Sequence, residues 1–230
     1  MPPPPPPPRV PRVIFWDVDT QYDFMKADGK LFVPDADHII GNLKRLTDYA
    51  HAHGIRIVAS ADDHVAGHAE ISDTPDWKTT FPPHCMRDTP GQKKIPETAL
   101  RNPFVIEPAR LDPKALADRV RAHQGDILFH KHRFDVFTNE NVPVVLDVLR
   151  PDDIVLYGVA TDVCDKAAVE GLLARLPHTR LFVVTDAVKG IDKDISEQLL
   201  KEWGEEGVRL VRTAEVVEEG LVEALARATA

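Results

Sequence analysis

Short apolar runs alternate along this chain with longer segments in which apolar residues recur every three or four positions. The run at 13–16 combines β-branched and aromatic residues, and it predicts a first buried strand. Asp35 or Asp37 can cap a helix with one apolar face that ends near Gly54. The run at 55–60 predicts a second strand, and the order strand–helix–strand indicates a right-handed crossover in a parallel sheet.

The same alternation continues towards the C-terminus. Further strands are expected at 126–131, 154–157, 181–184 and 208–211. Further helices are expected after Asp112, around 144–148, after Cys164, over 195–203 and over 213–228. About six strands that alternate with helices, without an internal repeat, predict a three-layer α/β fold. We expect a doubly wound, mainly parallel sheet with helices on both faces, as a single domain over residues 12–230.

Composition narrows the class of protein. A chain of 230 residues that is 43% hydrophobic and 28% charged is typical of a soluble globular protein with one core. The net charge of −9 disfavours nucleic acid or an anionic membrane as the main partner. No apolar run approaches the roughly 20 residues of a membrane span. Two cysteines and no secretory signal predict a cytoplasmic protein rather than a disulfide scaffold.

Residues 2–8 are consecutive prolines. They lack backbone donors and core-forming side chains, so residues 1–11 are predicted to be a disordered, extended polyproline tail. A ligand for a proline-recognition domain is the alternative interpretation.

Three chemically reactive side chains follow three of the predicted strands. Asp19 comes after the first strand, Lys131 ends the strand at 126–131, and Cys164 lies where a strand leads into a helix. Because parallel strands end at one edge of a sheet, we expect the three side chains to lie together. The ammonium and the helix terminus favour a Cys164 thiolate, and the carboxylate can take the thiol proton. A buried structural cysteine is the alternative for Cys164.

Apolar residues have no regular spacing between Asp62 and Gln92, where His, Asp, Glu and Pro are frequent. A loop of about thirty residues is longer than a connection requires, which favours a functional role. Its carboxylates and imidazoles can form a mixed nitrogen and oxygen site for one divalent transition metal, with Zn²⁺ expected first and Fe²⁺ or Mn²⁺ as alternatives.

Taken together, these segments resemble the cysteine hydrolase superfamily that contains nicotinamidases/pyrazinamidases and isochorismatases. Residues 19–24, Asp-Thr-Gln-Tyr-Asp-Phe, are similar to its opening motif, which implies Asp19 rather than Asp17 as the acid/base. The segment at Lys131 resembles that of the catalytic lysine, and 158–164, Gly-Val-Ala-Thr-Asp-Val-Cys, resembles that of the nucleophile, Cys164.

The loop resembles that of the nicotinamidase branch. The metal ligands that this resemblance implies are Asp62, His64, Glu70 and His84. Spacing measured from Asp62 and from His84 favours Glu70 as the third ligand, with His68 as the alternative.

The resemblance also implies a cis peptide bond at Val159–Ala160 and an oxyanion hole formed by the N–H groups of Ala160 and Cys164. It implies that Phe24 and Phe81 pack against a substrate ring, and that the protein is a homo-oligomer. The expected activity is metal-dependent hydrolysis of a small amide, with nicotinamide as the first candidate. The alternatives are another small amide or ureido compound, an isochorismatase-type hydrolysis, and a non-enzymatic metal-binding or proline-ligand protein.

Overall fold

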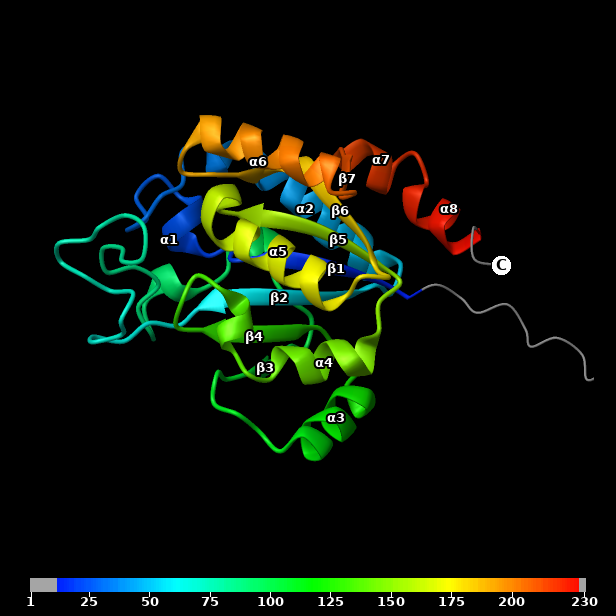
Figure 1. Cartoon of the computed structure of the whole chain (residues 1–230), viewed down its shortest axis with the longest axis horizontal. Coiled ribbons are helices and arrows are strands. Elements are labelled where there is room, and N and C mark those ends of the chain that lie inside the picture. The colour runs from blue at the N-terminus through cyan, green and yellow to red at the C-terminus, as the bar shows by residue number, and fades with distance from the viewer. Residues whose placement is uncertain (1–11, 228–230) are drawn as a thin grey trace, which may run out of the picture.

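The computed structural model describes residues 12–227, which contain a seven-stranded sheet with the order β3-β4-β2-β1-β5-β6-β7 (Figure 1). Every pair of neighbouring strands is parallel. The strands are β1 (Val13–Val18), β2 (Arg56–Asp62), β3 (Phe104–Ile106), β4 (Ile127–Lys131), β5 (Asp153–Val159), β6 (Arg180–Lys189) and β7 (Arg209–Val211). The helices are α1 (Tyr22–Met25), α2 (Ala36–Ala52), α3 (Pro113–Ala122), α4 (Val142–Leu149), α5 (Lys166–Arg175), α6 (Lys193–Glu205), α7 (Thr213–Val217) and α8 (Leu221–Arg227).

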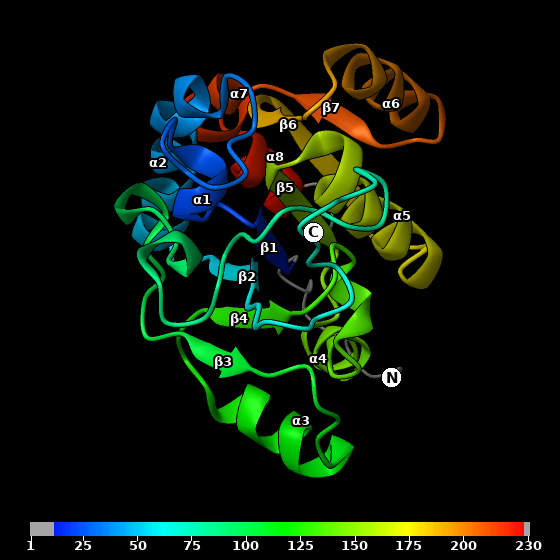
Figure 2. The same cartoon turned by 90° about the vertical axis from the view of Figure 1, so that its left-hand side faces the viewer.

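The sheet forms the middle of three layers because successive residues of a strand face opposite sides. In β1, Trp16 and Val18 pack in a core with residues of α3, α4, α5 and α6, whereas Phe15 packs in a second core with residues of α2. Figure 2 shows α2 and α7 on one face of the sheet and α4 and α5 on the other. The predicted α/β fold with helices on both faces is therefore confirmed.

Three elements differ from the sequence-based expectation, and one of them is the helix α1, whose four residues are too few to show a helical period. The strand β3 was not predicted, because it has three residues, lies at the sheet edge and exposes its central Val105. The helix expected over 213–228 is two shorter helices, α7 and α8, which are separated at Gly220, where φ is +72°. The predicted tail at 1–11 lies outside the described residues.

The topology brings the carboxyl ends of four central strands together. β4, β2, β1 and β5 are consecutive in the sheet, and Asp62 at the end of β2 is in register with Lys131 at the end of β4. A long connection that contains only two short 3₁₀ turns runs from Asp62 to β3 and covers this edge. Within residues 12–227, no helix is long and apolar enough to cross a membrane.

Candidate active site

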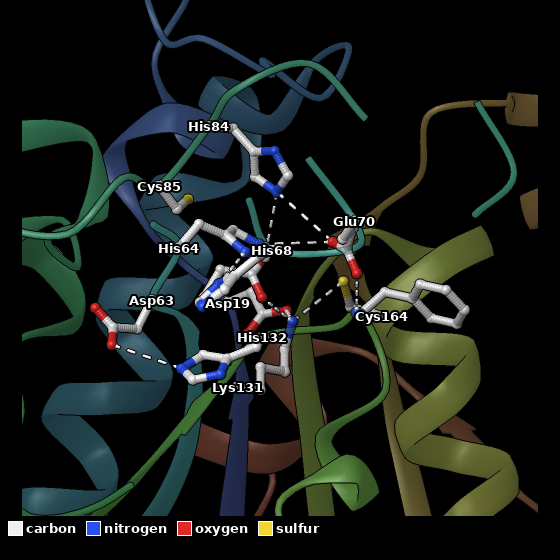
Figure 3. A network of polar contacts seen from close by, with 12 residues as sticks. Asp19, Asp63, His64, His68, Glu70, His84, Cys85, Lys131, His132 and Cys164 are labelled. Atoms are coloured by element: carbon white, nitrogen blue, oxygen red, sulfur yellow. Dashed lines mark hydrogen bonds and ion pairs between the residues drawn. The ribbon is translucent and has the colours of Figure 1, made fainter. Parts of the chain in front are cut away.

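The three reactive side chains predicted from the sequence do meet at this sheet edge (Figure 3). Asp19 follows β1 in a left-handed backbone conformation, with φ of +48°. Lys131 is the last residue of β4. Cys164 lies in a π-helical turn, Thr161–Asp165, between β5 and α5. Their meeting confirms the placement that the parallel sheet predicted.

Lys131 links these groups. Its Nζ lies 2.8 Å from Asp19 Oδ2, 2.5 Å from Asp62 Oδ1 and 3.8 Å from Cys164 Sγ. Although burial by itself would lower the pKa of Lys131, Asp19 and Asp62 raise it well above its ordinary value. The side chain is therefore a fully buried ammonium that pairs with two carboxyl groups.

The electrostatic environment of Cys164 differs from the expectation. Burial raises the pKa of the thiol well above its ordinary value; Lys131 opposes this rise, and Asp19 adds to it. The expected stabilisation of a resting thiolate was wrong, because desolvation and nearby carboxylates outweigh one ammonium. The resting Cys164 is a thiol, so its activation requires a base.

Asp17 and Asp19 have different partners. Asp19 Oδ1 accepts a hydrogen bond from Ser60 Oγ at 2.7 Å, and its other oxygen faces Lys131. Asp17 is paired instead with Lys94, whose Nζ lies 2.9 Å from its Oδ1. Of these two carboxylates, Asp19 is the one that shares Lys131 with the thiol, which agrees with its choice over Asp17.

Beside Lys131 lies a group of four buried side chains that could hold a metal ion. Asp62, His64, Glu70 and His84 each offer one ligand atom, and these atoms all lie within 4.8 Å of one another. Asp62 Oδ2 and His64 Nε2 are buried and have no hydrogen-bond partner. Buried polar atoms normally have partners, so two such atoms facing one point fit a divalent cation.

Neighbouring groups direct the remaining ligand atoms towards the same point. His84 Nδ1 lies 2.7 Å from the carbonyl of Pro82, which can only accept, so this nitrogen carries the proton and Nε2 has a free lone pair. Glu70 Oε2 accepts the N–H of Phe134 at 2.6 Å, while Oε1 lies 3.7 Å from His64 Nε2. These hydrogen bonds hold the side chains of His84 and Glu70 in place within the four-residue group.

The two carboxylates of this group differ in their electrostatics. Although burial would raise the pKa of Asp62, Lys131 holds it well below its ordinary value. Burial and then Asp62 raise the pKa of Glu70. A divalent cation would offset the repulsion between them.

His68 does not belong to the four-residue group. Its Nδ1 lies 3.4 Å from Nδ1 of His64 and accepts the N–H of Val65 at 3.3 Å. With His64 as the donor, this contact leaves Nε2 of His64 unprotonated for a metal. The geometry agrees with Glu70 as the third ligand and gives His68 the position of a supporting residue.

Gln21 was not predicted as part of the site. Its side chain accepts the N–H of Asp62 at 2.7 Å and donates to the carbonyl of the same residue at 2.8 Å. The side chain therefore fixes the backbone at the end of β2. The opening motif contained Gln21, but only the register of β1 and β2 reveals its partner.

The space above Cys164 is small and apolar. The Val159–Ala160 peptide is cis, as expected. A cavity of about 20 Å³ is lined by Cys164 and Ala160 and by the predicted Phe24 and Phe81. The Phe24 ring lies 5.4 Å from the ring of His84. The lining therefore places two aromatic rings beside Cys164 and the four-residue group.

Asp165, directly after Cys164, is a buried acid that the sequence did not single out. Neither of its carboxyl oxygens has a hydrogen-bond partner. Burial, followed by the charges of Asp19 and Asp162, raises its pKa well above its ordinary value. Asp165 therefore retains its proton in the folded protein.

Because of this raised pKa, Asp165 should destabilise the fold as pH rises. Above about pH 4 the unfolded chain releases the proton while the folded protein keeps it, so stability falls by about 1.4 kcal/mol per pH unit up to the folded-state pKa. We expect Asp165→Asn to increase the free energy of unfolding relative to the wild type, with a gain that grows as pH rises above about 4. Urea denaturation at several pH values measures this, and exposed Asp147 provides the control Asp147→Asn. A gain independent of pH would contradict an ionisable role for Asp165.

Comparisons with known proteins agree with this geometry. The profile of the isochorismatase domain matches residues 14–215. The nicotinamidase/pyrazinamidase of Mycobacterium tuberculosis is 28% identical over 207 residues, which cover 84% of this chain and 95% of that protein. The ureidoacrylate amidohydrolase RutB of Agrobacterium fabrum is 26% identical, over 72% of this chain and 68% of that protein.

Solved structures show the same fold. The pyrazinamidase of Pyrococcus horikoshii in complex with zinc superimposes with a TM-score of 0.68 at 23% identity. The superposition covers 88% of this chain and 99% of that one.

Proposed function

Since the chain belongs to the isochorismatase-like hydrolase family, we propose that it is a metal-dependent cysteine amidohydrolase that converts nicotinamide to nicotinate and ammonia. The observation that supports this proposal most directly is the position of Lys131. Its ammonium contacts Asp19, lies close to Cys164 and binds Asp62 of the four-residue group. The ammonium of Lys131 therefore lies beside the proposed nucleophile, the proposed base and one of the side chains proposed to bind the metal.

In the proposed reaction, Asp19 removes the proton from Cys164 Sγ as the sulfur attacks the carboxamide carbon. The ammonium of Lys131 stabilises the thiolate as it forms. The N–H groups of Ala160 and Cys164 stabilise the oxyanion of the tetrahedral intermediate. Asp19 then gives its proton to the departing amine, the C–N bond breaks, and ammonia leaves a thioester on Cys164.

Hydrolysis of the thioester completes the cycle. Asp19, again a carboxylate, removes a proton from water while the water oxygen attacks the thioester carbon. The C–S bond breaks and the proton returns to the sulfur. The product is nicotinic acid, which becomes nicotinate by releasing its proton to water, and Cys164 is restored as the thiol that its raised pKa favours.

Asp62, His64, Glu70 and His84 would hold the metal, which is expected to be Zn²⁺. When bound, it would supply a Lewis-acid contact that orients the pyridine nitrogen. Phe24 and Phe81 would pack against the ring.

A second small amide class is supported by one comparison. The similarity to a ureidoacrylate amidohydrolase favours a ureido compound as the alternative substrate, with the same nucleophile and base. An ammonia-release assay with nicotinamide, pyrazinamide and ureidoacrylate distinguishes the two candidates. Turnover of none of these amides would contradict the proposed amidohydrolase.

Metal removal should abolish nicotinamide turnover and lower thermal stability. Without a cation, the buried carboxylates of Asp62 and Glu70 repel one another at close range. We expect dialysis against a chelator to remove activity and added Zn²⁺ to restore it, together with a higher melting temperature. Differential scanning calorimetry and ammonia release measure both effects. Full activity in metal-free protein would contradict the proposed ligand role.

Single replacements of Glu70 and of His68 should distinguish a metal ligand from a residue that only supports a ligand. We expect Glu70→Ala to lose stoichiometric Zn²⁺ binding, because it removes one ligand atom from the group. His68→Ala should keep one Zn²⁺ per chain but weaken its affinity about 10- to 100-fold, because it removes the partner of His64. Competition titration with a chromophoric chelator measures both affinities. The reverse order of effects would assign the ligand role to His68.

A further inference from the structure

A second cavity adjoins the small one above Cys164. The inner cavity, of about 20 Å³, has room for about one water molecule. The outer cavity has a volume of about 490 Å³. Both are lined by Phe81, Phe134, Val163 and Ile191, so these four side chains separate them.

Backbone hydrogen bonds connect Phe81, Phe134 and Ile191 to residues of the proposed active site. The N–H groups of Phe81 and Phe134 donate to the carbonyl and the carboxylate of Glu70, respectively. The N–H of Ile191 donates to Asp162, in the turn that contains Cys164, at 2.9 Å. The outer cavity is therefore held in a fixed position relative to the nucleophile.

The outer cavity is lined by apolar side chains that are exposed to water, which is unfavourable. Among the described residues, six large apolar side chains are exposed, and three of them line this cavity. They are Trp77 at 59%, Ile195 at 50% and Ile191 at 36% exposure. An exposed apolar patch that continues into a reaction site is typical of a ligand-binding surface.

The charged side chains of the cavity already have partners, with one exception. Lys166 pairs with Glu170 at 3.7 Å, and Asp192 caps α6 by accepting the N–H of Ile195 at 3.0 Å. Asp162 accepts two backbone N–H groups. Lys78 has no ion-pair partner within the described part of the chain. The exposed apolar side chains of the cavity therefore favour a neutral, apolar group.

We propose that the outer cavity is a second substrate subsite, which binds an apolar extension of an amide whose carboxamide lies at Cys164. The proposal rests on the amidohydrolase function and extends it to substrates longer than nicotinamide. The extension would pass between Phe81, Phe134 and Ile191 and contact Trp77 and Ile195. The carboxamide and its hydrolysis are unchanged, so the outer residues affect binding rather than the chemical step.

Kinetics with matched substrates and variants test this subsite. The substrates are nicotinamide and its 5-phenyl and 6-phenyl derivatives, so that two directions of extension are sampled. Ile195 lines only the outer cavity and lies in the first turn of α6, where a carboxylate is favourable, so Ile195→Glu should fold. Ile195→Leu is the control that keeps the site apolar.

In the wild type, we expect at least one phenyl derivative to have a lower KM than nicotinamide. Ile195→Glu should raise that KM about fivefold or more with little change in kcat, whereas the constants for nicotinamide stay the same. Ile195→Leu should leave KM and kcat unchanged for both substrates.

Three other outcomes are distinguishable. Turnover of nicotinamide but of neither phenyl derivative would overturn the subsite and leave the amidohydrolase function intact. Equal effects on all substrates, with loss of an oligomer in light scattering, would make the cavity a contact between copies of the chain and overturn the subsite. Absence of turnover with every amide, including ureidoacrylate, would overturn the proposed function and the subsite together.

Discussion

Cys164→Ala is expected to lower ammonia release from nicotinamide on the order of 10⁴-fold or more, with the fold unchanged. The sulfur is the atom proposed to bond to the carboxamide carbon, and no water in its place would be activated to the same extent. The substitution removes one atom from a buried turn, so melting temperature and metal content should change little. A coupled ammonia assay measures the loss, and mass spectrometry of a quenched reaction should detect an acylated Cys164 in the wild type only.

The second cysteine provides a matched control. Cys85 is also free and buried, and it directly follows the proposed ligand His84. Its thiol lies outside the group around Lys131, so Cys85→Ala should keep most of the turnover. Comparable losses in the two variants would indicate that Cys164 contributes to packing rather than to chemistry.

Lys131→Met is expected to destabilise the protein by about 3–5 kcal/mol and to abolish turnover in the fraction that remains folded. The substitution keeps much of the side-chain volume but leaves two buried carboxylates, Asp19 and Asp62, without their shared cation. Repulsion between these buried carboxylates raises the free energy of the folded state. Chemical denaturation gives the stability change, and activity per folded molecule gives the catalytic effect.

A second buried ion pair provides a control that distinguishes an effect on stability from an effect on catalysis. Lys94 is nearly buried and pairs with Asp17 at 2.9 Å, away from the thiol. Lys94→Met should destabilise the protein to a similar extent but retain activity per folded molecule. Adding Asp19→Asn to Lys131→Met should recover part of the stability and none of the activity. Retained turnover in Lys131→Met would contradict the role proposed for its ammonium.

The layout of the fold was predictable because local patterns encode it. The runs at 13–16 and 154–157 are apolar because both faces of their strands are buried under helices, as β1 and β5 are. The Asp112-Pro113 pair predicted a helix start, and the Asp112 side chain does accept the N–H of Ala115. The edge strand β3 was not predicted because three residues are too few to show a strand period.

The reactive edge of the sheet was also predictable, but its electrostatics were not. Parallel strand order is enough to bring Asp19, Lys131 and Cys164 together. The pKa of Cys164 depends on how completely the surrounding side chains exclude water and on how many carboxylates share Lys131. Neither quantity is a property of a local segment, and the expected thiolate was wrong for that reason.

The sequence by itself determined which residue types stand at the strand ends and in the long loop, since apolar periodicity and motif spacing are local. Only the tertiary structure decided how they are paired. It directs Glu70 towards His64 and His84 and leaves His68 behind His64, although only Ala69 separates Glu70 from His68 in the sequence. It also joins Asp62 to both Lys131 and the other members of the four-residue group. These choices depend on side-chain direction and strand register, which form only when distant segments pack against one another.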